Sequence, residues 1–262
     1  MLEKRIPYYP PSALAGATAY QRERCHLDLR CPDGAKGFKT VVWFHGGGLT
    51  EGEAHFVPID PSIAQAAVDY RFLQADGSVT GDDCIDDAAA AVAWALDHVA
   101  AWGGDPKQVY VSGMSAGAYL TMMVGMDPGR LGKWGHRPTE LAGLVPISGQ
   151  ASKHFAVRQF AGDHDPQFLP KIDRLAPLNF CAADLPPILS ICGAPPYEFP
   201  ARSEENRLLV ASCAALGHPR AQFVQLPFCD HGRAENAAMP YLEMFVKGQM
   251  LPGLVVAPPP AP

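Results

Sequence analysis

Residues 108–126 read QVYVSGMSAGAYLTMMVGM. The first part of this stretch is rich in β-branched and aromatic residues and predicts a strand, and residues 116–126 predict a helix. Between them lies Gly113-Met114-Ser115-Ala116-Gly117, a G-x-S-x-G pentapeptide. So sharp a turn from strand to helix strains the central backbone and presents the Ser115 hydroxyl above the sheet. We therefore predict Ser115 as a nucleophile. The alternative is an inert serine in a glycine-flanked turn.

A second glycine-rich segment, His45-Gly46-Gly47-Gly48, directly follows the predicted strand 39–44, KTVVWF. Glycines leave backbone N–H groups free to bind the oxyanion that develops during acyl transfer. We expect Gly46, Gly47 and Gly48 to form an oxyanion hole with the N–H of Ala116, which follows Ser115. His45 is expected to order the loop by hydrogen bonding. The alternative is a flexible turn without a role.

A serine nucleophile needs a positioned base. In proteins with such a serine turn, the chain order is nucleophile, acid, histidine. His231 follows the last predicted strand and precedes the last predicted helix, so it is the expected base. His154, His164 and His218 also come after Ser115, but they lie in an irregular segment or at a helix end.

The acid should follow the predicted strand 187–193. The next loop, 194–200, contains one carboxylate, Glu198, which is our candidate. Asp184, before the strand, and Asp230, beside the histidine, remain alternatives. Two further carboxylates nearby, Glu204 and Glu205, are expected on a helix surface.

Elsewhere, short β-rich runs alternate with helical runs. This alternation predicts an α/β protein with a mostly parallel sheet covered by helices on both faces. The further predicted strands are 25–30 (an edge strand), 64–72, 141–148 and 221–226, and the further helices are 83–101, 202–216 and 235–247.

Residues 1–250 are expected to form one domain. Within it, residues 151–183 show neither the apolar periodicity of a helix nor that of a strand. They predict an insertion of loops and short helices near the active site. Residues 251–262 end in APPPAP and are expected to form a loosely held Pro-rich tail. The expected pocket residues are Met114, His154, Phe155, Arg158, Tyr197 and Phe199. Arg158 could recognise a carboxylate or a sugar hydroxyl, but we expect it to be exposed and solvated.

The composition excludes several classes of protein. The 262 residues are 48% hydrophobic and 18% charged, with a formal net charge of −6. This balance, without clustered Lys and Arg, argues against nucleic-acid binding. No apolar run reaches the roughly 20 residues of a membrane span. The sequence as written predicts a cytoplasmic protein, or a secreted or periplasmic one if a signal peptide was removed. It does not indicate an oligomeric state.

The sequence contains no metal-binding pattern. Its seven cysteines are scattered without a C-x-x-C arrangement and are expected to be free, mostly buried thiols. A Cys25–Cys31 bridge is the alternative for a secreted protein. The segment Gly162-Asp163-His164-Asp165 is interpreted as a solvated turn. We expect no metal and no cofactor.

Four segments carry a family resemblance: VVWFHGGGL at 41–49, VDYR at 68–71, WGGDPKQVYVSGMSAGAYL at 102–120 and EFPARSEEN at 198–206. Together with the closing Asp-His-Gly at 230–232, they resemble the α/β-hydrolase carboxylesterases with an HGGG oxyanion motif. Within that superfamily, the chain is similar to small bacterial esterases related to feruloyl esterases, acetyl-xylan esterases and kynurenine formamidase.

The resemblance implies an α/β-hydrolase fold without a large cap domain, with Ser115 as nucleophile and His231 as base. The acid loop departs from the common pattern, because Pro196 stands where an aspartate is usual. Glu198 corresponds to a carboxylate found in similar members. Ala118 occupies a position where many members have a second glycine.

The function implied is a serine carboxylesterase that cleaves short-chain or aryl carboxylic esters through an acyl-enzyme. An aryl-formamidase or other amidase with the same triad is the main alternative. A peptidase is less favoured, because no propeller or large cap accompanies the core. A non-catalytic binding protein of the same fold is the alternative from another class.

Overall fold

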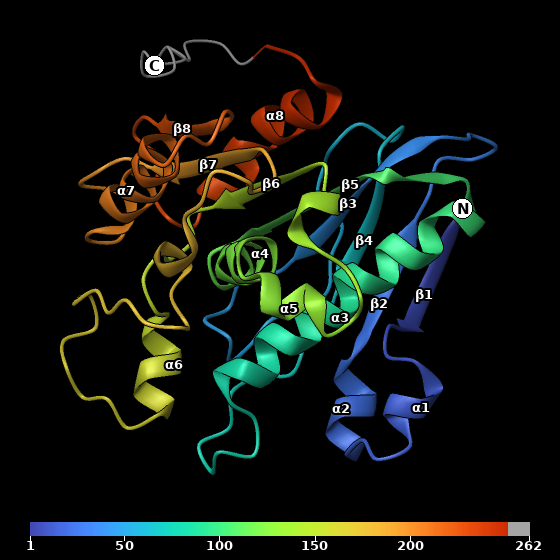
Figure 1. The fold of residues 1–262 in the computed structure, drawn as a ribbon, viewed down its shortest axis with the longest axis horizontal. Helices are drawn as coiled ribbons and strands as arrows, with labels where there is room; N and C mark the ends of the chain where they lie inside the picture. Colours follow the sequence, from blue (N-terminus) through green and yellow to red (C-terminus); the bar gives the residue numbers. More distant parts are fainter. Residues whose placement is uncertain (251–262) are drawn as a thin grey trace.

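The computed structural model describes residues 1–250, so the predicted tail 251–262 lies outside the described residues. An eight-stranded sheet has the order β1-β2-β4-β3-β5-β6-β7-β8 (Figure 1). β2 pairs antiparallel with β1 and β4, and the pairs from β4 onward are parallel. The strands are β1 (Leu2–Pro7), β2 (His26–Arg30), β3 (Phe38–Phe44), β4 (Ala64–Val68), β5 (Gly104–Met114), β6 (Gly143–Ile147), β7 (Ile188–Gly193) and β8 (Ala221–Leu226).

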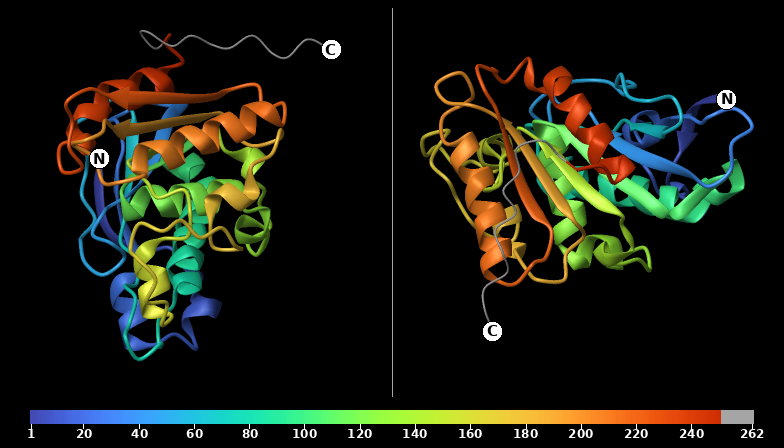
Figure 2. Two further views of the ribbon diagram at one scale, coloured as in Figure 1. Left: turned by 90° about the vertical axis from the view of Figure 1, so that its left-hand side faces the viewer. Right: turned by 90° about the horizontal axis from the view of Figure 1, so that it is seen from above.

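Helices cover both faces of this sheet. Figure 2 shows α8 on one face and α3, α4 and α7 on the other. The prediction of an α/β-hydrolase fold, with a mostly parallel sheet and no large cap, is therefore confirmed. The helices are α1 (Pro11–Leu14), α2 (Ala19–Arg24), α3 (Gly81–His98), α4 (Ala116–Met126), α5 (Pro128–Gly132), α6 (Phe155–Phe160), α7 (Arg202–Ala215) and α8 (Ala234–Lys247), with 3-10 turns at Val99–Trp102, Pro138–Glu140 and Pro177–Phe180.

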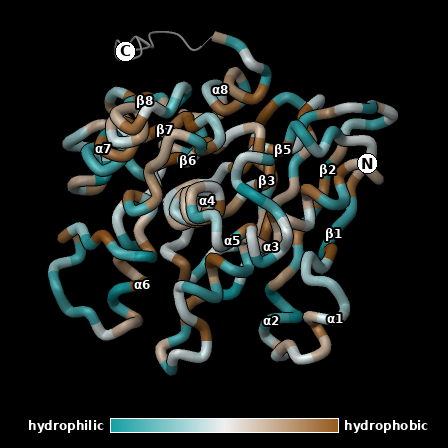
Figure 3. The backbone as a smooth tube through the Cα atoms, in the orientation of Figure 1, coloured by the Kyte–Doolittle hydropathy of each residue, from teal (hydrophilic) through white to brown (hydrophobic). Residues whose placement is uncertain are grey.

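The central strands are buried on both faces. Along β3, Val42 and Phe44 belong to the core under α3 and α4, whereas Val41 and Trp43 belong to the core under α8. This explains why the strand is a continuous apolar run rather than an alternating one. In Figure 3, brown segments follow the central strands, and the outer loops are mostly teal or white.

The N-terminal edge of the sheet differs from the prediction. Residues 25–30 do form a strand, but β2 lies between β1 and β4, so the expectation of an edge strand there is wrong. β1 was not predicted, because LEKRIP is charged and almost wholly exposed and has no apolar pattern. It joins the sheet through backbone pairing with β2. β5 starts at Gly104 rather than at residue 108, and its register with β3 is irregular between Gly104 and Val109.

A buried ion pair joins α3 to the segment after β4. Asp87 accepts hydrogen bonds from the backbone N–H of Arg71 and from two nitrogens of its guanidinium, at 2.7–3.0 Å. Asp87 also accepts the hydroxyl hydrogen of Tyr9 at 2.6 Å. The pair fixes the VDYR segment below the glycine loop. Within residues 1–250, no helix is both long enough and apolar enough to cross a bilayer.

Candidate active site

Ser115 lies at the junction of β5 and α4 in a strained conformation, with φ 56° and ψ −113°. Its N–H donates to Ile147 O on β6 at 2.8 Å. A Cβ at Gly117 would overlap the Phe44 carbonyl oxygen, and one at Gly113 would lie 2.6 Å from the same oxygen. The turn can therefore form only with glycine at both positions, as the pentapeptide predicted.

The structure brings Ser115, His231 and Glu198 together from three loops. The Ser115 hydroxyl donates to His231 Nε2 at 2.9 Å. His231 Nδ1 lies 2.7 Å from Glu198 Oε1. Because an ionised carboxylate only accepts hydrogen bonds, Nδ1 carries the ring proton and Nε2 is the free acceptor. This tautomer is the one that a general base for Ser115 requires.

Glu198 is buried and held as an anion. Its Oε1 also accepts the N–H of Phe199 at 2.8 Å, and its Oε2 accepts the Ser148 hydroxyl at 2.7 Å. Burial opposes ionisation, but the hydrogen bonds from His231 and Ser148 outweigh it and lower the pKa of Glu198 to about 2. The carboxylate is therefore negative at neutral pH and can balance a protonated imidazole.

The other carboxylates lie elsewhere. Asp184 is exposed, and Asp230 accepts the N–H of Arg233 at 2.9 Å rather than facing the ring of His231. Glu204 is exposed as predicted. The same expectation is wrong for Glu205, which is buried and accepts the N–H groups of residues 151 and 152 at 3.0 and 2.8 Å. Its long-range partners explain its burial.

The glycine loop lies against the nucleophile. A Cβ at Gly46 would be 3.5 Å from the Cβ of Ser115. Gly47 and Gly48 have φ values of +102° and +63°, which favour glycine. Among residues 1–250, no group accepts a hydrogen bond from the N–H of either. Ala116 is the first residue of α4, where backbone N–H groups lack helical partners. These groups can together solvate an oxyanion.

His45 orders this loop. Its ring stacks on Tyr70 at 4.4 Å, and its Nδ1 lies 2.6 Å from Gly46 O. Burial lowers its pKa to about 4, so it is neutral at pH 7. The Tyr70 hydroxyl donates to His45 O at 2.9 Å. The structural role predicted for His45 agrees with these contacts.

Three of the predicted pocket residues lie beside these groups. The Phe199 ring stacks on His231 at 4.2 Å and is 41% exposed. The Phe155 ring lies near Gly48: a Cβ at Gly48 would be 4.0 Å from the Cζ of Phe155. Met114 is buried next to Gly46. Tyr197 is half exposed and lies farther out, against the ring of Phe228.

Two predicted pocket residues do not line an open pocket. His154 is fully buried, and its Nδ1 accepts the N–H of Ala156 to cap α6. Burial lowers its pKa to about 3. The expectation of an exposed Arg158 is wrong. Arg158 is 2% exposed and binds the Asp163 carboxylate and the carbonyl oxygen of Leu169. Its guanidinium joins parts of the segment 151–183 to one another and is not free for a ligand.

Two residues of the site, Ser148 and Arg202, were not predicted from the sequence. Ser148 bonds Glu198, as described above, and Arg202 donates to Ser148 O at 2.8 Å. One sequence signal was present for Ser148, because it ends the predicted strand 141–148, and the next predicted strand, 187–193, leads into the acid loop. A lone serine there does not by itself indicate a contact 50 residues away.

Neither metal ligands nor disulfides appear among residues 1–250. No three His, Cys, Asp or Glu side chains are grouped so that they could hold a metal ion in this part of the chain. The carboxylate of Asp163, in the segment 162–165, is paired with Arg158. The seven cysteines are free, including Cys25 and Cys31.

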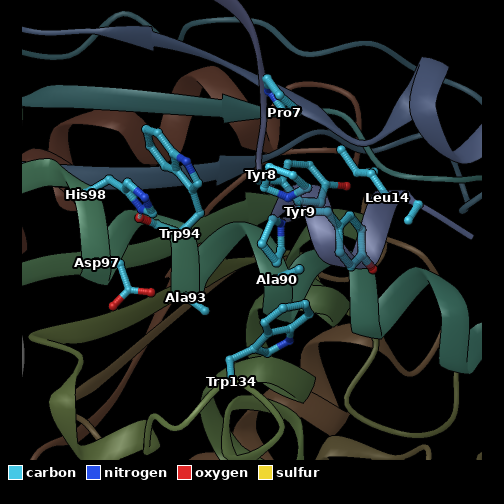
Figure 4. A pocket seen from close by; sticks show the side chains of 13 residues that line it. Pro7, Tyr8, Tyr9, Leu14, Ala90, Ala93, Trp94, Asp97, His98 and Trp134 are labelled. Atoms are coloured by element: carbon cyan, nitrogen blue, oxygen red, sulfur yellow. Dashed lines mark hydrogen bonds between the residues drawn. The ribbon is translucent and has the colours of Figure 1, made fainter. Parts of the chain in front are cut away.

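A cavity of about 530 Å³ lies away from these residues (Figure 4). Its wall combines the N-terminal segment with α3 and includes Tyr8, Tyr9, Trp94 and Trp134. The Tyr8 and Tyr9 hydroxyls already donate to Asp69 O and to the carboxylate of Asp87. Since neither Ser115 nor His231 lines this cavity, it is separate from the candidate active site.

Part of the chain is similar in sequence to known esterases. Residues 27–134 match the model of the BD-FAE family. Rattus norvegicus liver carboxylesterase B-1 is 31% identical over 177 residues, which cover 55% of this chain and 31% of that protein. Myzus persicae esterase E4 is 34% identical over 89 residues, 30% of this chain and 16% of that protein. A probable isoprenylcysteine alpha-carbonyl methylesterase of Arabidopsis thaliana is 32% identical over 121 residues, which cover 44% of this chain and 24% of that protein. The chain thus spans less than a third of the length of these relatives.

Solved structures match over almost the whole chain. A truncated carbohydrate esterase from gut microbiota has a TM-score of 0.74 and 17% identity, covering 95% of this chain and 96% of its own. The butyrate-bound esterase Est2 of Thermogutta terrifontis has a TM-score of 0.65 and 21% identity, and the match covers 87% of this chain and 91% of that esterase. At these identities the likeness shows the fold. The chain thus has an α/β-hydrolase fold, and part of its sequence is similar to the BD-FAE family and to carboxylesterases.

Proposed function

We propose that the protein is a serine carboxylesterase that hydrolyses short-chain or aryl carboxylic esters through an acyl-enzyme. The observation that carries the proposal is the continuous hydrogen-bonded chain from Ser115 through His231 to Glu198, next to the glycine loop, where a Cβ at Gly46 would lie 3.5 Å from the Cβ of Ser115. The names of the curated relatives, among them carboxylesterases and a methylesterase, support ester cleavage.

In the proposed first step, the Ser115 oxygen attacks the ester carbonyl while His231 Nε2 removes its proton. The carbonyl oxygen becomes an oxyanion within reach of the N–H groups of Gly47, Gly48 and Ala116. His231 then donates its proton to the leaving alcohol, and an acyl group remains on Ser115. Water enters and repeats the sequence to release the acid. No step requires a metal or an organic cofactor.

Glu198 acts through His231. The ionised carboxylate keeps the ring proton on Nδ1 and stabilises the imidazolium that forms in both steps. A neutral group at this position would leave a positive ring without a counter-charge in a partly buried site. We therefore assign the role of triad acid to Glu198 rather than to Asp184 or Asp230.

The side chains around the triad favour an apolar small-molecule substrate. The half-exposed Phe199 ring covers one face of His231, the group that protonates the leaving alcohol. Phe155 lies near Gly48, on the side of the oxyanion hole. Aromatic surface at both places suits short acyl chains and aryl esters. We propose these two residues, with Met114, as the substrate-contacting set.

The test is hydrolysis of p-nitrophenyl acetate, butyrate and octanoate without added metal, by the wild type, Ser115→Ala and Ser112→Ala. Ser112 is a matched control, because its buried hydroxyl donates to Val145 O and does not contact the triad. Turnover by the wild type and the control, abolished in Ser115→Ala, is expected. Equal turnover in Ser115→Ala would contradict the proposal. Faster cleavage of N-formylaniline than of any ester would reassign the site to an amidase with the same triad.

A further inference from the structure

Ser148 lies at the carboxyl end of β6, next to the nucleophile turn. It is fully buried and has a φ of +50°, which non-glycine residues rarely adopt. Its N–H donates to Ile191 O on β7 at 2.7 Å. The preceding residue, Ile147, accepts the N–H of Ser115. One short stretch of β6 therefore touches both the nucleophile turn and the strand that leads into the acid loop.

The hydroxyl of Ser148 binds the oxygen of Glu198 that faces away from the imidazole. Oε1 accepts hydrogen bonds from His231 and from the N–H of Phe199, while Oε2 accepts the one from Ser148 at 2.7 Å. The Cys192 thiol, at 3.8 Å from Oε2, is a much weaker donor. A glutamate has one more rotatable bond than an aspartate. Without a donor on Oε2, the carboxylate could rotate away from His231.

A second layer of contacts holds Ser148 itself, and it comes from α7, the helix that follows the acid loop. The buried Arg202 donates to Ser148 O at 2.8 Å. Asn206 donates to Gly149 O at 2.7 Å, and Glu205 accepts the N–H groups of the two residues after Gln150. These bonds hold the backbone in the unusual conformation that aims the hydroxyl at Glu198.

We propose that Ser148 is a positioning residue for the reaction, whose hydroxyl fixes the orientation of the Glu198 carboxylate toward His231. The inference rests on the proposed function, because it assigns a role to Ser148 within that triad. Ser148 does not touch the substrate. It acts through Glu198, and the hydrogen bonds from α7 hold the backbone at Ser148 in place.

The test compares Ser148→Gly and Ser148→Ala with the control Ser112→Ala, which also loses one buried hydroxyl. Glycine adopts a φ of +50° without strain, so Ser148→Gly removes the hydroxyl and preserves the backbone. Hydrogen bonds to charged groups have energies that correspond to about a 10- to 100-fold change in rate. We expect kcat for p-nitrophenyl butyrate to fall by about that factor in both Ser148 variants, with KM little changed. Ser112→Ala should keep the wild-type kcat.

A wild-type kcat in Ser148→Gly would overturn the inference, whatever the activity of Ser148→Ala. In that case the backbone and not the hydroxyl would matter. A rise in KM with constant kcat would also overturn it, since that pattern indicates lost substrate binding rather than lost positioning.

A second measurement needs no substrate. The Nδ1 proton between His231 and Glu198 should give a far-downfield proton NMR resonance, assigned by its loss in His231→Gln. We expect it in the wild type and in Ser112→Ala, and expect it to be lost or shifted upfield in Ser148→Gly. An identical resonance in Ser148→Gly and wild type would contradict the inference even if the wild type cleaved no ester. Absence of ester cleavage would by itself contradict only the proposed function.

Discussion

Replacing Glu198 with glutamine should leave the protein folded and nearly inactive. Glutamine keeps the shape of the side chain and can still accept a hydrogen bond from His231 Nδ1, but it lacks the charge. Oε2 becomes an amide nitrogen that faces the Ser148 hydroxyl, so Ser148 must accept instead of donate. The imidazolium that forms during acyl transfer then has no counter-ion.

The size of the effect follows from the carboxylate's surroundings. A pKa of about 2 against an ordinary value of 4.5 corresponds to a preference of about 3 kcal/mol for the ionised form. The charged hydrogen bond to the imidazolium that forms in the transition state contributes up to about 3 kcal/mol, which corresponds to roughly 100-fold in rate. Removing the charge from the acid of a serine-protease triad costs about 10⁴ in kcat. We therefore expect kcat for Glu198→Gln to fall between about 100-fold and about 10⁴-fold.

The assay is steady-state hydrolysis of p-nitrophenyl butyrate, with circular dichroism to verify folding. Glu204→Gln is the matched control, because it makes the same change at an exposed position on α7 and should keep full activity. Folded Glu198→Gln with kcat within about tenfold of the wild type would refute the assignment. If Asp184→Asn were inactive at the same time, the acid would be Asp184.

Three other changes test the frame of the site. Gly117→Ala introduces a methyl group that overlaps the carbonyl oxygen of Phe44. The free energy of unfolding, measured by urea denaturation, should fall by about 3 kcal/mol or more. Near-wild-type stability would show that the turn tolerates a side chain. Gly47→Ala, at a φ of +102°, should displace the oxyanion N–H groups and reduce kcat for p-nitrophenyl butyrate by about 100- to 1000-fold, and an unchanged kcat would exclude this glycine from the oxyanion hole. Asp87→Ala leaves the Arg71 guanidinium without its partner and should cost about 3–5 kcal/mol in the same denaturation experiment, whereas a loss below about 1 kcal/mol would contradict the importance of the pair.

Acid pH provides a further test. The folded-state pKa of Glu198 is depressed, so its ionisation stabilises the fold above the ordinary pKa of 4.5, and this contribution is lost as the pH falls toward about 2. The stability advantage of the wild type over Glu198→Gln should therefore shrink between pH 5 and pH 3. An advantage that stayed constant over this range would indicate that Glu198 is not held as an anion by its partners.

Much of the fold and the three linked residues could be predicted because their signals are local. The turn at Ser115 is encoded in five consecutive residues, and the strands on either side are continuous apolar runs. His231 and Glu198 followed from chain order, since parallel strands bring their carboxyl-end loops to one edge of the sheet. Glu198 required elimination in addition, because its loop contains no other carboxylate.

Other features depend on partners far away in the sequence. Glu205 and Arg158 are charged and were expected at the surface, but each is buried by hydrogen bonds that local pattern cannot reveal. β1 lacks an apolar pattern because it needs only backbone pairing at an edge. Ser148 is a single hydroxyl whose importance lies in its direction. Such features become visible only when the chain is folded.

The proposed reaction requires that Ser115 becomes acylated, and rapid quenching detects this acyl-enzyme. The wild type is mixed with p-nitrophenyl acetate, quenched in acid within milliseconds and analysed by mass spectrometry of the intact chain and of its peptides. We expect one acetyl group on the peptide that contains Ser115, formed together with a burst of p-nitrophenol, and neither in Ser115→Ala. Ester turnover without any acetylated Ser115, or an acetyl group that persists in Ser115→Ala, would contradict it.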